Sequence, residues 1–168
     1  MEDRTIPVGN GAVPLELGPL YEAYADMIYR LALVRTKNRS DAEDVLQDVF
    51  FRCLRRQPEF RDQEHQKAWL ITAAIRSSNS LLTRADRRHG AGAEPLEALS
   101  TQDDTDDTVY TAVMGLPEKY RTAVHLFYYE GYSVEEIGRM TDTKPSTVKS
   151  HLHRAREALR QVLKEDVE

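Results

Sequence analysis

The sequence is poor in several features that mark whole classes of protein. It has a single cysteine, Cys53, which excludes an internal disulfide and any cysteine-based zinc site. No apolar run approaches the roughly 20 residues that a membrane-spanning helix needs, so we expect no membrane insertion. The first residues lack a basic segment followed by an apolar one, so we expect no secretory signal and a cytoplasmic location.

Motifs of catalysis and of cofactor binding are also missing. The five histidines include one close pair, His151 and His153. Residues two apart on a helix point to different sides, whereas metal ligands on a helix need a spacing of three or four. The sequence has no phosphate-binding glycine loop and no Ser/His/Asp signature. We therefore expect no catalytic residue, no metal and no cofactor, and we expect that the chain is not an enzyme.

Charge is distributed unevenly along the 168 residues, although the formal net charge is only −5. Residues 1–19 carry −2, residues 20–88 carry +3, residues 89–107 carry −6, and residues 108–168 are neutral. The acidity therefore lies in the leader and in one short internal stretch. The two longer segments remain compatible with binding nucleic acid, in spite of the acidic total.

Composition divides the chain into two lobes. Residues 89–107 combine glycine, proline, serine, threonine and acids with few large apolar residues, which predicts a flexible acidic linker. We predict a flexible leader over residues 1–19 and domains over residues 20–88 and 108–168. Apolar residues recur at helical spacing in both lobes, so the predicted fold is all-α, with two small helical domains. Domains of this size are only marginally stable alone, which favours a larger partner that fixes their arrangement.

The first lobe is predicted to be a series of helices separated by turns. Ser40 and Glu43 form a capping box, in which each side chain satisfies a free backbone donor, and this box opens a helix. A later helix runs through Lys67–Ile71 and another over about Leu81–Arg88. A loop is expected between them, over Arg76–Ser80.

The second lobe contains the pattern of a helix-turn-helix. A capping box from Ser133 to Glu136 opens a short helix, and residues 141–143 form a turn after it. A long final helix follows, and the three parts together predict a helix-turn-helix. The final helix carries one apolar stripe, formed by Val148, Leu152, Ala155, Leu159 and Val162.

The final helix also carries the strongest signal for DNA binding. Between Lys144 and Arg160 the bases outnumber the acids by four. Residues near the start of such a helix can enter the major groove and contact base edges, while bases farther along can hold phosphates. The alternative is a solvated amphipathic helix at the end of a bundle. The candidate DNA-binding residues face away from the apolar stripe and are Ser146, Thr147, Lys149, Ser150, His151 and Arg154.

Five segments resemble a known family. Residues 116–121 (LPEKYR), 130–137 and 147–156 are similar to region 4 of an extracytoplasmic-function (ECF) sigma factor. Residues 41–50 resemble region 2 of the same family, and residues 68–71 fit its promoter-opening segment. The resemblance covers both lobes, in the order that the family has.

The resemblance implies a bacterial transcription initiation factor. Region 2 of the family docks on the clamp helices of the β′ subunit of core RNA polymerase and captures the −10 promoter element. Region 4 binds the β flap and reads the −35 element, and an anti-sigma factor usually covers the polymerase-binding faces. By alignment with the family, residues 76–80 form the loop that would hold a flipped base. The implied −10 residues are Lys67, Trp69, Arg76, Ser77, Ser78, Asn79, Ser80, Arg84, Arg87 and Arg88.

One face of the helix that follows Ser40 fits the docking role. An exposed phenylalanine among acids and a glutamine is typical of a protein interface. The alternative is that Phe51 packs against a neighbouring helix of its own lobe. The candidate polymerase-binding residues are Asp44, Gln47, Asp48, Phe51 and Arg55.

A stand-alone helix-turn-helix regulator that binds DNA as a homodimer is the alternative function. It would explain the final helix but would leave the first lobe without a role. Such a regulator needs enough bases to bind its operator unaided, and this chain is net acidic. We therefore predict weak duplex binding by the protein alone and tight, sequence-specific binding only with core polymerase.

Overall fold

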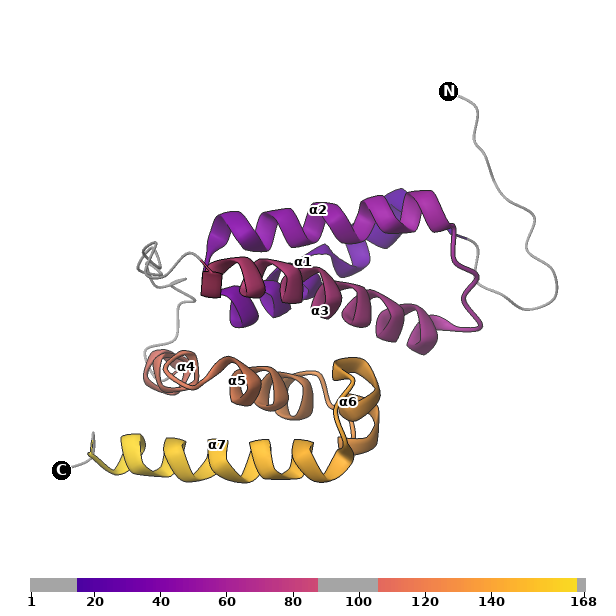
Figure 1. The fold of residues 1–168 in the computed structure, drawn as a ribbon. Coiled ribbons are helices and arrows are strands. Elements are labelled where there is room, and N and C mark those ends of the chain that lie inside the picture. The colour runs from indigo at the N-terminus through magenta and orange to yellow at the C-terminus, as the bar shows by residue number, and fades with distance from the viewer. Residues whose placement is uncertain (1–14, 88–105, 166–168) are drawn as a thin grey trace. The chain divides into compact units, whose positions relative to one another are not determined.

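The computed structural model describes residues 15–87 and 106–165 of the chain. The regular elements in these ranges are helices, and they fall into two compact units, one built mainly of α1 to α3 and one mainly of α4 to α7 (Figure 1). This confirms the predicted all-α fold with two helical domains. The predicted linker lies outside the described residues except for its last two positions. No helix within the described ranges is long and apolar enough to cross a membrane.

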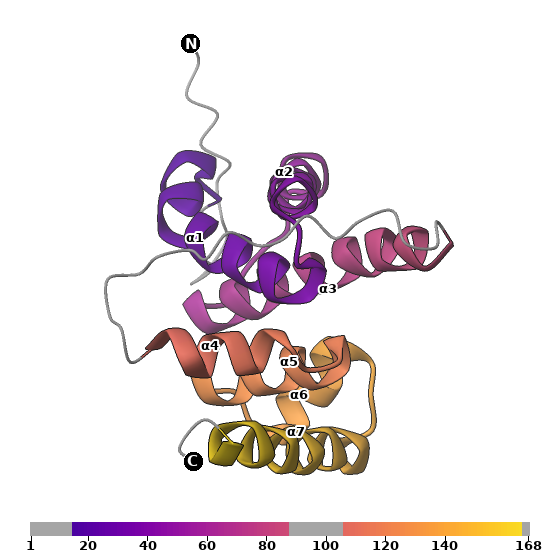
Figure 2. The same ribbon diagram turned by 90° about the vertical axis from the view of Figure 1, so that its left-hand side faces the viewer.

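The first unit contains α1 (Leu17–Thr36), α2 (Arg39–Arg56) and α3 (Gln63–Arg87). Figure 2 views α2 nearly end-on, with α1 and α3 beside it. An aromatic contact joins α1 to α2, since the ring centroids of Tyr21 and Phe50 lie 4.9 Å apart. Residues from all three helices form the core, and those that are almost fully buried include Ile28, Leu31, Val45, Val49, Leu70 and Ile71.

α3 is one continuous helix, so the loop predicted over residues 76–80 is wrong. The segment contains neither proline nor glycine, and its small serines fit a packed helix face. Ser77 and Ser78 are only 7% and 0% exposed. The Ser78 hydroxyl donates to the carbonyl of Ile75 at 2.9 Å, a bond that a helix supplies to a buried serine without breaking. The polar segment was predicted to be a loop, but its serine side chains are small enough to be buried in a helix.

The two predicted capping boxes have different outcomes. α2 begins at Arg39, so Ser40 lies inside the first turn and the capping box predicted there is wrong. α6 (Val134–Thr141) has the predicted box. The Glu136 amide donates to Ser133 Oγ at 3.2 Å, and the Ser133 amide donates to Glu136 Oε2 at 2.8 Å.

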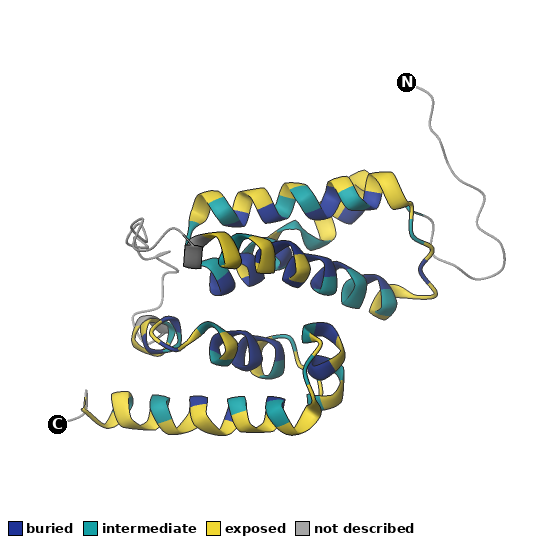
Figure 3. Cartoon of the chain, viewed as in Figure 1, coloured by how far each residue is buried: buried dark blue, intermediate teal, exposed yellow. Residues whose placement is uncertain are grey.

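The second unit contains α4 (Asp106–Met114), α5 (Glu118–Val124) and a π-helical turn, η1 (His125–Tyr129), before α6. The last helix is α7 (Pro145–Glu165), which packs against α4, α5 and α6. In Figure 3 the buried positions of α7 line its inner side and the exposed positions its outer side. Val148, Leu152 and Ala155 are buried and Leu159 is half-buried, but Val162 is 42% exposed, so the predicted apolar stripe ends earlier than expected.

The turn between α6 and α7 depends on two special backbone positions. Asp142 adopts the left-handed conformation, with φ 52° and ψ 50°, which aspartate tolerates better than most residues. The Thr143 amide then donates to the carbonyl of Gly138 at 2.8 Å. A Cβ at Gly138 would lie 2.6 Å from the Thr143 carbonyl oxygen, so only glycine allows this close approach. The turn fixes how α7 leaves α6 and completes the predicted helix-turn-helix.

Candidate nucleic-acid and polymerase interfaces

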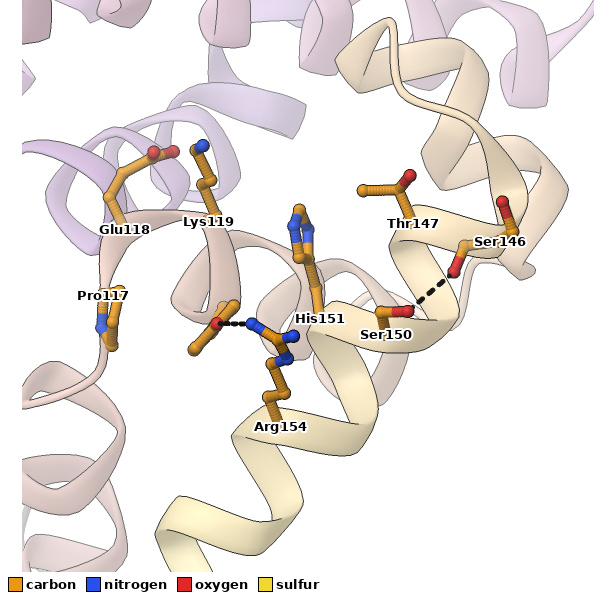
Figure 4. A pocket seen from close by; sticks show the side chains of 9 residues that line it. Pro117, Glu118, Lys119, Ser146, Thr147, Ser150, His151 and Arg154 are labelled. Atoms are coloured by element: carbon orange, nitrogen blue, oxygen red, sulfur yellow. Dashed lines mark hydrogen bonds between the residues drawn. The ribbon is translucent and has the colours of Figure 1, made fainter.

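A cavity of about 660 Å³ lies in the second unit, between the start of α5 and the first turns of α7 (Figure 4). α7 contributes five of the six residues predicted to bind DNA from this helix: Ser146, Thr147, Ser150, His151 and Arg154. Sequence reasoning missed the opposite wall, which consists of Pro117, Glu118, Lys119 and Tyr120. The remaining candidate, Lys149, is exposed on α7 but does not line the cavity.

Hydrogen bonds orient side chains on both sides of this cavity. Arg154 Nη1 donates to the Tyr120 hydroxyl oxygen at 3.5 Å, which links α7 to α5 (Figure 4). Ser150 Oγ donates to the carbonyl of Ser146 at 3.2 Å, so this hydroxyl oxygen keeps acceptor capacity toward the cavity. No spacing in the sequence relates Tyr120 to Arg154, because the two residues are 34 positions apart and meet only in the fold.

His151 has its charge state set by these surroundings. Burial lowers the pKa of His151, and the positive charges of Lys119 and Arg154 lower it further, against a smaller opposite effect of Glu118. The imidazole is therefore neutral near pH 7, where one ring nitrogen donates and the other accepts. The hydrogen bond from Arg154 to Tyr120 raises the pKa of the guanidinium, which stays charged. The cavity thus combines a permanent cation with a neutral donor and acceptor, groups that suit base edges in a groove.

The −10 candidates divide between the faces of α3. Arg76, Asn79, Ser80 and Arg84 are exposed and recur at spacings of three and four, so they form one stripe, and half-buried Trp69 lies seven residues before Arg76 on the same face. Thr72 and Thr83 continue the same spacing on either side of the predicted loop, and the sequence analysis missed them. We call the whole set the α3 stripe; its members are Trp69, Thr72, Arg76, Asn79, Ser80, Thr83 and Arg84.

Three predicted −10 residues lie on other faces of α3 and are not part of the α3 stripe. Ser77 and Ser78 are buried in the core of the first unit. Lys67 lies nine positions before Arg76, which is half a turn out of phase on a helix of 3.6 residues per turn. Arg88 and the side chain of Arg87 lie outside the part of the chain that the structure describes.

The predicted polymerase-binding face of α2 is exposed. Phe51 is 59% exposed, so the alternative that it packs within its own lobe is wrong. Asp44, Gln47 and Arg55 are exposed as well, and half-buried Asp48 pairs with Arg52 at 3.0 Å. Leu54 was missed, although it lies three residues after Phe51, and it is 53% exposed. We call Asp44, Gln47, Asp48, Phe51, Leu54 and Arg55 the α2 surface.

Both units match family models. Residues 20–88 match Sigma-70 region 2, and residues 106–159 match Sigma-70, region 4. The two matches lie in the order in which the sequence resemblance placed them. The stand-alone regulator is not favoured, because it leaves the region 2 match without a role.

Curated proteins similar to the chain are sigma factors. The chain is 32% identical over 143 residues to RNA polymerase sigma factor SigV of Bacillus subtilis, covering 83% of this chain and 86% of that protein. It is 31% identical over 147 residues to ECF RNA polymerase sigma factor SigM of Mycobacterium tuberculosis, covering 86% and 75%.

A solved structure has a similar fold. The sigma factor RpoE of Bartonella quintana, crystallised with the anti-sigma factor NepR, aligns with a TM-score of 0.69 at 22% identity. The alignment covers 88% of this chain and 96% of that one. This likeness shows a shared fold, and the two family matches and the curated relatives give the assignment. The chain belongs to the extracytoplasmic-function group of the sigma-70 RNA polymerase sigma factors.

Proposed function

We propose that the chain docks on core polymerase through the α2 surface and reads the −35 element with the cavity residues of α7. The α3 stripe holds the −10 element while the promoter opens. The α2 surface meets the β′ clamp helices, and the second unit meets the β flap. The chain works by binding, without catalysis of its own, and acts in the cytoplasm. An anti-sigma factor that covers its polymerase-binding faces keeps it inactive, in line with the similar sigma factor that was crystallised with one.

The observation that carries this proposal is the exposure of the α2 surface. Phe51 and Leu54 place two large apolar side chains in solvent, 59% and 53% exposed, with Gln47 and Arg55 near them on the helix. Buried aromatic and leucine anchors with a polar rim are the usual anatomy of a protein interface. A regulator that binds DNA alone has no use for such a face on a separate unit.

Charge supports the same division of labour. The chain carries −5, so the unaided protein lacks the excess of cations that tight duplex binding requires. The cavity residues of α7 can still select a sequence once the polymerase supplies most of the affinity. Promoter recognition is therefore expected from the complex with core polymerase rather than from the chain alone.

Run-off transcription with purified core polymerase, the full chain and a library of promoter fragments tests the proposal. We expect specific transcripts that depend on the added chain, and we expect the chain to co-elute with core polymerase. Phe51→Ala should weaken core binding about tenfold or more, because it removes a central anchor. Leu17→Ala, which truncates an exposed apolar residue of α1, is the matched control and should bind as the wild type does.

Two results would overturn the proposal. One is nanomolar binding of an operator by the protein alone at physiological salt, with no co-elution with core polymerase, which would establish the stand-alone regulator. The other is equal core binding by the wild type and by Phe51→Ala, which would remove the α2 surface from the interface.

A further inference from the structure

Tyr120 touches two of the residues proposed to read DNA, although it lies on a different helix. Its hydroxyl accepts a hydrogen bond from Arg154 Nη1 at 3.5 Å. Its ring centroid lies 5.5 Å from that of His151, with the ring planes at 51°. We propose that Tyr120 is a positioning residue that fixes Arg154 and His151 for base reading and so helps to set −35 specificity. The proposal rests on the proposed function of α7.

Arg154 needs such a partner because it is exposed and long. A free arginine side chain has many rotamers, and ordering them on DNA costs binding free energy. A partner that holds the guanidinium beforehand lowers that cost. A neutral phenol holds it without cancelling its charge, whereas a carboxylate would also repel the phosphates. The guanidinium has five N–H donors, so a single bond to Tyr120 leaves donors for a base edge.

His151 lies one helical turn before Arg154, on the same face of α7. Both side chains line the cavity (Figure 4). Tyr120 of α5 lines it as well. The tyrosine ring packs against the imidazole at a tilt, a contact that agrees with the burial that lowers the pKa of His151. A single residue of α5 therefore restrains two neighbouring reading groups, and its loss should loosen both.

The second unit supplies a matched control for the Tyr120 bond. Tyr128 of η1 accepts a hydrogen bond from Arg156 Nη1 of α7 at 3.0 Å, so it is also a tyrosine that bridges to an arginine of the same helix. Neither Tyr128 nor Arg156 lines the cavity. Removing either phenol oxygen costs one exposed interhelical bond, but only Tyr120 touches the reading groups.

The test measures binding of the holoenzyme to promoters randomised in the −35 element. Tyr120→Phe should weaken binding to the preferred promoter about threefold, the size expected for one hydrogen bond. It should also relax base preference at the position that Arg154→Ala relaxes. Tyr128→Phe should leave affinity and preference as in the wild type. Tyr120→Phe combined with Arg154→Ala should lose no more than Arg154→Ala alone, because the two changes remove one interaction.

A second measurement needs no DNA. NMR titration of the protein alone should show the pKa of His151 rising toward its ordinary value in Tyr120→Ala, which uncovers the ring. In Tyr120→Phe, which keeps the ring, the pKa of His151 should stay low. Thermal unfolding of each variant shows whether the second unit remains folded.

Several outcomes would overturn the inference. Base preference that is unchanged in Tyr120→Phe, or relaxed equally in Tyr128→Phe, would give Tyr120 a structural role only, as would losses that add in the double variant. An unchanged pKa of His151 in Tyr120→Ala would show that the Tyr120 ring does not shield the imidazole. If Arg154→Ala itself leaves base preference unchanged, the proposed role of α7 has failed, and the His151 titration still decides whether the Tyr120 contact exists.

Discussion

α3 and α7 are both long helices proposed to meet promoter DNA, and they present their polar residues differently. α7 turns Ser150, His151 and Arg154 toward a second wall formed by α5, across a cavity. The α3 stripe runs along one helix, and its threonine hydroxyls donate to carbonyls of the same helix: Thr72 to Ala68 at 2.8 Å and Thr83 to Asn79 at 2.9 Å. His151 and Arg154 of α7 are therefore held by a residue of another helix, whereas the threonine hydroxyls of α3 are held by their own helix.

This difference suits the two forms of DNA that a sigma factor meets. Duplex DNA presents a fixed pattern of base edges, which side chains held in advance can match. An opened single strand is flexible, and a row of cations, hydroxyls and an aromatic side chain can bind along its length. We therefore expect changes in α7 to alter base preference and changes on the α3 stripe to alter promoter opening.

The largest effect is expected from a change inside α3. Ser78 is fully buried, so Ser78→Asp would place a carboxylate in the core of the first unit. An unpaired buried charge lowers the free energy of unfolding by about 3–5 kcal/mol. Urea unfolding followed by the fluorescence of Trp69, the single tryptophan, reports on this unit.

Ser80→Asp is the control, because Ser80 is exposed on the α3 stripe two residues later. Its free energy of unfolding should stay within about 0.5 kcal/mol of the wild type, while the added negative charge weakens binding of the opened strand. If instead Ser78→Asp is folded normally and loses binding of the opened strand, residues 76–80 form a DNA-binding loop in solution.

How much the sequence could predict differs between the same two helices. For α7, the capping box at Ser133 that opens the preceding helix, the short turn and the apolar stripe all predict a helix-turn-helix. Each of these signals depends only on residues that are close in the sequence. For α3, the run Arg76–Ser80 is polar, and a local reading cannot tell a polar loop from small side chains packed in a helix. The burial of Ser77 and Ser78 depends on neighbours supplied by other helices.

The candidate sites follow the same pattern. Residues that share one helix, such as those of the α2 surface apart from Leu54, could be found from spacing, and Phe51 is exposed as its polar neighbours indicated. The wall formed by Lys119 and Tyr120 could not be found, because a contact across 34 residues leaves no periodic signal. Spacing predicts a face, but only the fold shows what lies opposite that face.

The next effect separates the two helices by specificity. Arg154→Ala should lower holoenzyme affinity for the preferred −35 duplex about tenfold and relax the choice at one base position, as expected when a base-reading arginine is lost. Arg84→Ala, on the α3 stripe, should leave −35 preference unchanged and slow promoter opening. Permanganate footprinting measures opening, and binding to randomised duplexes measures preference.

Arg160→Ala is the control on α7. Arg160 pairs with Glu157 at 3.2 Å, and both side chains are largely exposed, outside the cavity. It should leave base preference unchanged, and all three variants should bind core polymerase as the wild type does. Equal loss of base preference in Arg84→Ala and Arg154→Ala would abolish the distinction between the helices.

The smallest effect is a pH dependence confined to α7. The pKa of His151 is lowered in the protein alone, by burial first and then by Lys119 and Arg154, with Glu118 opposing. Nearby DNA phosphates would favour the charged imidazolium, so the pKa of His151 rises on binding and the complex takes up a proton. Affinity for the −35 duplex should therefore increase as the pH falls from 7.5 to 5.5, by about threefold for one exposed charge pair.

His151→Gln should remove this pH dependence, whereas His153→Gln should keep it, because His153 is exposed on α7 outside the cavity. The α3 stripe contains no histidine, so binding of a single-stranded −10 fragment should not change over the same pH range. Fluorescence anisotropy of the holoenzyme with each labelled DNA measures both dependences. A −35 affinity that is equally pH-dependent in His151→Gln would mean that the titrating group lies elsewhere. A pH dependence shared by both DNA fragments would place that group outside both the α3 stripe and the cavity residues of α7.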